Sequence, residues 1–162
     1  MSWQLRDPAF RDAIHAVLDR APCALAGTVG AQVHVASVLG LEKLGPLAHA
    51  IEVVTFHGED LPNRIDSIPV KRVDALGFEA SVEAACSTVC VGEEEFRVAS
   101  PEHVLGMGLG GLELPPDAKW ACFLLMRTLY GRLDLEEVRG FLKRCPEPDR
   151  QSLLAELAYL AA

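Results

Sequence analysis

The chain has 162 residues, of which 50% are hydrophobic and 23% are charged, and its formal net charge at pH 7 is -8. A chain of this length buries enough surface to fold as one domain without a disulfide or a structural metal. We therefore expect a single domain over residues 1–162. Its acidic balance repels a phosphate backbone, and its 15 lysines and arginines form no dense run, so nucleic acid is not expected as the primary partner.

The pattern of apolar residues argues against a membrane protein and against export. No stretch approaches the roughly 18 uninterrupted apolar residues that a membrane-spanning helix needs. Residues 1–12 carry charges of both signs and lack the basic start and apolar core of a secretory signal. We expect a cytoplasmic protein. Its five cysteines are an odd number, lie in apolar runs and show no metal-ligand spacing, so we expect reduced thiols and no metal site.

The first part of the chain predicts a helix, a strand and a second helix. Apolar residues at helical spacing, with charges opposite them, predict an amphipathic helix over residues 8–20. The short apolar run 23–27 ends in Gly27 and indicates a buried strand that turns sharply. We expect Thr28 to cap the helix that follows, which runs to about residue 41 and has valines and small residues on most faces.

The middle of the chain reads as strands interrupted by one short helix. Residues 50–56 are rich in β-branched side chains and predict a central strand in which Glu52 is the only charge. Pro69 is expected to open a short helix that ends at Gly77. Residues 78–83, 87–91 and 95–99 are expected to be strands, the last two joined in a hairpin around Gly92.

The last third of the chain predicts helices. Ser100 is placed to cap the first of them, with Pro101 in its first turn. Further helices are expected over residues 117–130, from a cap at Asp134 to residue 144, and over the leucine-rich final segment. The predicted class is therefore α+β: a small mixed sheet with helices packed on it in residues 1–99, then a helical part in residues 100–162.

Two segments of this chain carry a resemblance to a known family. Residues 24–28 (Ala-Leu-Ala-Gly-Thr) look like an apolar strand that leads into a glycine turn at a helix start. Residues 96–105 (Phe-Arg-Val-Ala-Ser-Pro-Glu-His-Val-Leu) look like the segment that leads many nucleotidyltransferases into their helical part. The order of elements resembles the minimal nucleotidyltransferases, including the branch found in toxin–antitoxin pairs. The resemblance implies that the glycine turn offers backbone amides to a triphosphate.

The catalytic acids that the resemblance implies are largely missing. The family holds magnesium with two acids, one residue apart, on its second strand and a third acid on a later strand. Here the matching run is Ala50-Ile51-Glu52, so one acid remains, and Glu83 stands alone near the third position. Either the acids have been lost or the alignment is out of register. Loss is favoured, because a shift by two residues finds no second carboxylate.

Three other features have competing interpretations. The loop 57–60 follows a strand end and combines a histidine with two acids, which suits either a ligand site or a solvated turn. The glycine-rich run 106–111 lacks the Lys-Ser/Thr of a phosphate-binding loop, so a loose or tightly packed helix end is favoured. The apolar helix over 120–129 suits either a core or a partner interface, and core is favoured.

From these observations we expect a non-catalytic nucleotidyltransferase-like protein that binds another protein or a nucleotide. No catalytic residue, cofactor or metal site is predicted. The candidate ligand-binding residues are Gly27, Thr28, Glu52, His57, Glu59 and Asp60. One alternative is a divergent, active nucleotidyltransferase that holds magnesium with Glu52 and either Glu59 or Asp60. Another is an antitoxin or regulatory subunit whose helical part docks a partner. The sequence leaves the oligomeric state open.

Overall fold

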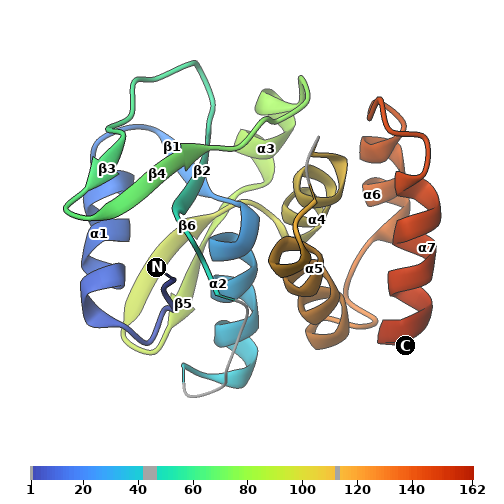
Figure 1. Cartoon of the computed structure of the whole chain (residues 1–162), viewed down its shortest axis with the longest axis horizontal. Helices are drawn as coiled ribbons and strands as arrows, with labels where there is room; N and C mark the ends of the chain where they lie inside the picture. The colour runs from blue at the N-terminus through green and yellow to red at the C-terminus, as the bar shows by residue number, and fades with distance from the viewer. Residues whose placement is uncertain (1, 42–46, 112–113) are drawn as a thin grey trace.

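A computed structural model describes residues 2–41, 47–111 and 114–162. Within these ranges it contains a six-stranded mixed sheet and seven helices, so the expected α+β class is confirmed (Figure 1). The strands are β1 (Cys23–Leu25), β2 (Ile51–Thr55), β3 (Arg64–Ile65), β4 (Ile68–Arg72), β5 (Ser87–Val91) and β6 (Glu94–Val98). The helices are α1 (Pro8–Leu18), α2 (Gly27–Leu39), α3 (Glu79–Ala85), α4 (Pro101–Gly110), α5 (Pro116–Thr128), α6 (Leu135–Leu142) and α7 (Arg150–Ala161).

The short strand β1 lies near the centre of the sheet, whose order is β3-β4-β2-β1-β6-β5. It runs antiparallel to β2 and parallel to β6. On its other side β2 runs parallel to β4. The expected hairpin is confirmed, since β5 and β6 pair antiparallel along their whole length. Because β1 and β2 run in opposite directions, the end of β1 lies beside the start of β2, and this edge of the sheet forms the candidate site.

Two hydrophobic clusters form the core, one on each side of the sheet. Alternate residues of the central strands point to opposite faces. Cys23 and Leu25 of β1 join the cluster that contains α1, whereas Ala24 joins the cluster that contains the helices of the carboxyl-terminal part. Helix α2 contributes to both clusters, and its residues 28–35 are all buried, as the sequence predicts. In Figure 1, α2 stands between the sheet and the pair α4 and α5.

Two predicted elements are wrong. Residues 69–76 do not form a helix, because β4 occupies Ile68–Arg72 and pairs with β2. Pro69 is tolerated there because it comes before Val70, the first residue of β4 that pairs with β2, so no hydrogen bond of that ladder is lost. Residues 78–83 do not form a strand but lie mostly in helix α3. In that seven-residue helix only Val82 is buried, so the apolar pattern is too short to distinguish the 3.6-residue period of a helix from the two-residue period of a strand.

The two helix starts predicted in the carboxyl-terminal part are confirmed. The Ser100 hydroxyl accepts from the backbone N–H of His103 at 3.1 Å. The Asp134 carboxylate accepts from the backbone N–H groups of Glu136 and Glu137 at 3.1 and 3.2 Å. These side chains satisfy amides that have no partner within the helix.

The glycine-rich run belongs to a tightly packed helix end, as favoured from the sequence. It lies largely in α4, and a Cβ at Gly106 would stand 2.8 Å from the Phe141 ring of α6. Helix α5 is core on one face only, because Cys122 and Leu125 are buried whereas Trp120 is 50% exposed. The expectation of a core helix therefore holds for one face of α5.

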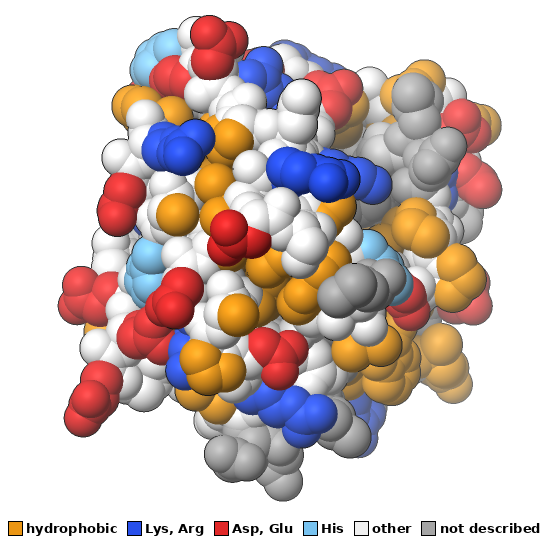
Figure 2. All heavy atoms as spheres, turned by 60° about the vertical axis from the view of Figure 1, so that its left-hand side comes forward, with side chains coloured by type: hydrophobic (Ala, Val, Ile, Leu, Met, Phe, Trp, Pro, Cys, Tyr) orange, Lys and Arg blue, Asp and Glu red, His pale blue; other side chains and the backbone are white. Residues whose placement is uncertain are grey.

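Charged side chains of both signs are interspersed on the surface. Figure 2 shows one face, on which lysines and arginines form small separate groups among acidic side chains. In the described ranges, no helix has the length and apolar character needed to cross a membrane.

Arg97 of β6 ties the strand to the segment that joins α1 and β1. Its guanidinium donates to the carbonyl oxygens of Leu18 at 2.8 Å and Ala21 at 3.3 Å, and also to that of Cys23. Hydrogen bonds from a charged donor contribute about 1.5–3 kcal/mol each when one partner is lost. This contact therefore holds β1 in register with its neighbour.

We predict that Arg97→Met lowers the free energy of unfolding by at least about 2 kcal/mol, because three carbonyls lose a charged donor. Urea denaturation followed by circular dichroism measures this change. Arg20→Met, in the same segment but exposed, is the control and should stay within about 0.5 kcal/mol of wild type. Equal stability of the two variants would contradict the assigned role of Arg97.

Candidate functional site

Glu52 projects from the sheet toward the helical part of the molecule. Its neighbours Ile51 and Val53 belong to the cluster on the α1 side, whereas Val54 belongs to the cluster on the opposite side. Strand alternation therefore places Glu52 with Val54, facing the helices. Lys71 of β4 is the register partner of Glu52 and flanks it on the same face. The one charge in this strand is thus aimed into the space between the two parts.

The Glu52 carboxylate caps the amino terminus of α2. Its Oε1 accepts from the backbone N–H of Thr28 at 3.0 Å, and the Glu52 carbonyl accepts from the N–H of Ala26 at 2.9 Å. Ala26 is the cap residue of this helix and offers no side-chain acceptor. The prediction that Thr28 caps the helix is therefore wrong, because Thr28 lies inside the first turn. A carboxylate from another strand does the capping and also complements the helix dipole.

Gly27 makes this contact sterically feasible. Its φ of +58° lies in the region that favours glycine, and a Cβ there would stand 2.2 Å from Glu52 Oε2. The expected proximity of Gly27, Thr28 and Glu52 is therefore present. It depends on the absence of a side chain at residue 27.

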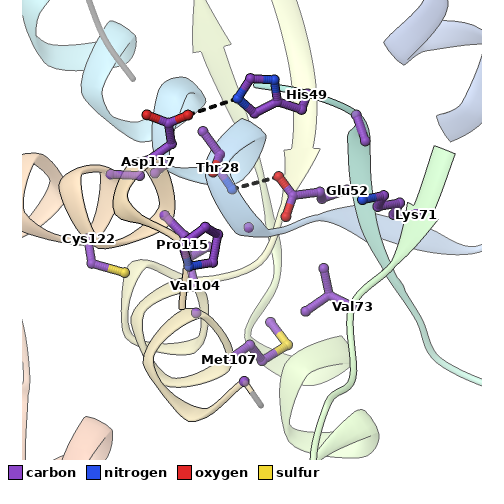
Figure 3. Close-up of a pocket in the computed structure, with 17 residues that line it drawn as sticks. Thr28, His49, Glu52, Lys71, Val73, Val104, Met107, Pro115, Asp117 and Cys122 are labelled. Atoms are coloured by element: carbon purple, nitrogen blue, oxygen red, sulfur yellow. Dashed lines mark hydrogen bonds and ion pairs between the residues drawn. The ribbon is translucent and has the colours of Figure 1, made fainter. Parts of the chain in front are cut away.

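A pocket of about 350 Å³ opens beside this contact (Figure 3). It lies between the sheet edge, the start of α2 and the helices α4 and α5, and we call it the Glu52 pocket. Its volume is at the small end of the range for ligand sites. Its polar lining residues are Thr28, His49, Glu52, Lys71 and Asp117. Its apolar lining includes Ala31, Val73, Val104, Met107, Ala121 and Cys122.

A second polar contact joins the two parts of the molecule at the rim of the pocket. The ring Nε2 of His49 lies 2.8 Å from Asp117 Oδ2, and both side chains are more than half exposed. His49 directly precedes the sheet edge, and Asp117 lies in the first turn of α5. Figure 3 shows the pair on the same side of the pocket as the Thr28 contact.

Burial has the largest effect on the pKa of two side chains of the pocket wall, Glu52 and Cys122. It raises the pKa of Glu52, although the Thr28 N–H, Lys71 and His49 act in the opposite direction. It also raises the pKa of the Cys122 thiol to about 12, with a smaller contribution from the nearby Glu52 carboxylate. The pocket is therefore a poorly solvated site in which an uncompensated charge is costly.

The predicted site residues His57, Glu59 and Asp60 do not join this pocket. They follow the end of β2, where Thr55 pairs with Cys23 at the start of β1, whereas the pocket lies at the opposite end of β1. The loop forms its own exposed network instead. The His57 N–H donates to Glu59 Oε2 at 2.9 Å, and the His57 ring contacts Glu83 at 3.1 Å. The grouping of this loop with Glu52 is wrong, because Glu52 lies at the start of β2 whereas the loop follows its end.

Several lining residues were not identified from the sequence. Lys71 was missed because its segment was assigned to a helix, which hid its pairing with Glu52. His49, Asp117, Met107 and Cys122 reach the pocket through packing between elements distant in sequence. Of these residues only Asp117 could have been noticed from the sequence, as an acid in the first turn of a predicted helix. Such an acid is also expected for its favourable interaction with the helix dipole, so it does not by itself indicate a site.

The pocket offers a poor donor set for magnesium. Among the described residues, no group of three or more His, Cys, Asp or Glu side chains is arranged to hold a metal ion. Glu52 is bound to a helix terminus, and Asp117 is bound to His49. The pocket thus combines a largely apolar lining with one carboxylate, that of Glu52, beside the start of α2.

The sequence matches no known family model and no curated protein.

We predict that Gly27→Ala destabilises the protein by at least about 2 kcal/mol. A left-handed conformation costs a residue with a side chain about 1–2 kcal/mol, and the added methyl also displaces Glu52. Gly92→Ala is the matched control, because its φ is +63° and nothing lies within 4 Å of its Cβ position. Thermal unfolding of both variants, repeated in a Glu52→Ala background, measures the two costs. A Gly27→Ala cost that does not fall in that background would contradict the contact.

We predict that Cys122 resists alkylation in the folded protein. At pH 8, a thiol with a pKa of about 12 instead of 9.0 holds roughly a thousandfold less thiolate, the reactive form. Cys90, which is exposed, supplies the internal comparison. Iodoacetamide labelling followed by peptide mass spectrometry should detect modified Cys90 first, and Cys122 only after unfolding in urea. Similar rates at both residues in the folded state would refute the burial of Cys122.

Proposed function

We propose that this chain is a non-catalytic binding protein on a nucleotidyltransferase-like scaffold, which receives a small ligand in the Glu52 pocket. The observation that carries the proposal is the capping of α2 by Glu52 at the edge of an apolar pocket. Residues 24–28, which resemble a triphosphate-binding turn, lead into the amino terminus of α2, and the Glu52 carboxylate already accepts a hydrogen bond there. A nucleotide or its base portion is one class of ligand compatible with this scaffold.

The geometry disfavours nucleotide transfer. Transfer assisted by two metal ions needs at least two carboxylates that converge on the same ions. The position two residues before Glu52 is Ala50, which is 2% exposed and carries no ligand atom. Glu59 and Asp60 lie beyond the far end of β2, so they cannot complete a site with Glu52. The alternative of an active enzyme built on those residues therefore has no geometric support.

A second candidate function, a regulatory or antitoxin subunit, is favoured by one observation. The helical part exposes large apolar side chains, as a docking surface for another protein would. These are Trp120 at 50% exposure, Tyr130 at 64%, Tyr159 at 83% and Leu160 at 53%. Recovery of the protein from native extract as a partnerless monomer would count against this candidate.

We predict that the purified protein transfers no nucleotide to itself or to other acceptors, with or without magnesium, because the carboxylates of the pocket are already paired: Glu52 with the Thr28 N–H, and Asp117 with His49. Incubation with each of the four labelled nucleoside triphosphates tests this. Magnesium-dependent labelling that disappears in Glu52→Ala would overturn the non-catalytic assignment.

The binding part of the proposal needs its own measurement. Amide chemical shifts recorded by NMR, during titration with nucleosides, nucleotides and small amines, should respond around Thr28 and Val104 for at least one of these classes. Ala118→Trp, which places a large side chain on the pocket lining, should remove the response. Lys119→Trp is its control, because it places the same side chain at the next, exposed position. If no compound perturbs the pocket, small-ligand binding is wrong and the docking candidate gains support.

A further inference from the structure

The position that would bind a phosphate in this pocket is already occupied. Backbone amides at a helix amino terminus form a ready-made anion site. Here the Thr28 N–H donates to Glu52 Oε1, and Glu52 Oε2 lies against Gly27. The Glu52 carboxylate therefore fills the turn. A phosphate entering this turn would meet a carboxylate at the place where it needs donors. The Glu52 carboxylate therefore takes the place that the anionic group of a ligand would occupy, and it disfavours binding of such a group.

The remaining charges of the pocket also disfavour an anionic ligand. Among the residues that the structure describes, its lining carries two carboxylates, Glu52 and Asp117, and one ammonium group, Lys71. Lys71 is exposed and lies beside Glu52 in the sheet, where its positive charge partly offsets the negative charge of that carboxylate. The protein as a whole is also strongly acidic. An incoming triphosphate is repelled both at long range and at the site.

The rest of the wall selects an apolar body. Val73 lines the pocket just after the end of β4, and Val104 and Met107 line it from α4 (Figure 3). The small side chains of Ala31 in α2 and Ala121 in α5 also belong to the lining. Burying a flat or compact apolar group against such a wall is favourable, at about 25 cal/mol for each Å² removed from water. A ligand in this pocket then needs a polar group chiefly at Glu52, where it can form a hydrogen bond with the carboxylate.

We infer that the ligand of this pocket is a phosphate-free small molecule with an apolar, ring-sized body, which donates N–H groups to the Glu52 carboxylate. Amidines and amino-substituted heteroaromatic rings, including nucleobases, have this chemistry. An N–H donor or cation at Glu52 compensates a poorly solvated carboxylate, whereas a phosphate adds a second negative charge beside it. The inference rests on the proposed function, since it specifies the ligand of the same pocket.

Three ring compounds of nearly equal shape test the inference: benzamidine, benzamide and benzoate. Titration calorimetry and amide chemical shifts should detect benzamidine in the wild-type pocket, weaker binding of benzamide and none of benzoate. Glu52→Gln keeps an acceptor for the Thr28 N–H but removes the charge, so it should weaken benzamidine at least about tenfold. Ala118→Trp should abolish binding, and Lys119→Trp should leave it unchanged.

Pyrophosphate supplies the converse test. Wild type should not bind it, whereas Glu52→Ala, which frees the amides of the turn, should gain binding that Ala118→Trp removes. A circular dichroism spectrum and a cooperative unfolding transition establish that each variant is folded. If Glu52→Ala does not fold, Glu52→Gln in the benzamidine titration decides the question alone.

The outcomes separate this inference from the proposed function. If benzoate, pyrophosphate or a nucleoside triphosphate binds the wild-type pocket as tightly as benzamidine, the inference is wrong, but a ligand-binding pocket stands. Benzamidine binding that Glu52→Gln does not change would also overturn the inference. If none of these probes, nucleosides included, binds wild type, both the inference and small-ligand binding fail.

Discussion

The contact between the Glu52 carboxylate and the amino terminus of α2 organises this molecule. It satisfies a backbone amide that has no partner within the helix, and it fixes the start of α2 against the second strand of the sheet. Because β1 leads directly into α2, the same contact sets the position of the helix between the sheet and α4 and α5. The pocket exists where these elements meet. Its shape and its charge therefore depend on one partly buried side chain.

The direction of the strands determines which residues can cooperate. Because β2 is antiparallel to β1, the start of β2 lies beside the end of β1 and the Gly27 turn, and the end of β2 lies at the opposite edge of the sheet. Glu52 stands near the first end, and the acidic loop of His57 and Glu59 follows the second. Residues that are close in sequence are thus separated, whereas Asp117, 65 positions after Glu52, lines the same pocket. Proximity along the chain was a poor guide to the composition of the site.

The sequence predicted those features that depend on local chemistry. The amphipathic helix α1, the hairpin of β5 and β6 and the caps at Ser100 and Asp134 all follow from spacing and side-chain type. The proximity of Glu52 to the Gly27 turn was expected from the resemblance to nucleotidyltransferases. The segment of β4 was misassigned because pairing with β2, not its own pattern, makes it a strand. The pocket wall could not be predicted, since packing between distant helices creates it.

Helix α2 has no solvent-facing side along residues 28–35, and it supplies side chains to both hydrophobic clusters. The change from sheet to helices near residue 100 is therefore not a boundary at which the chain can be divided. A fragment ending there would leave one side of α2 without its packing partners and would expose apolar surface prone to self-association. The two parts are expected to unfold together, as one cooperative unit, with α2 as the element they share.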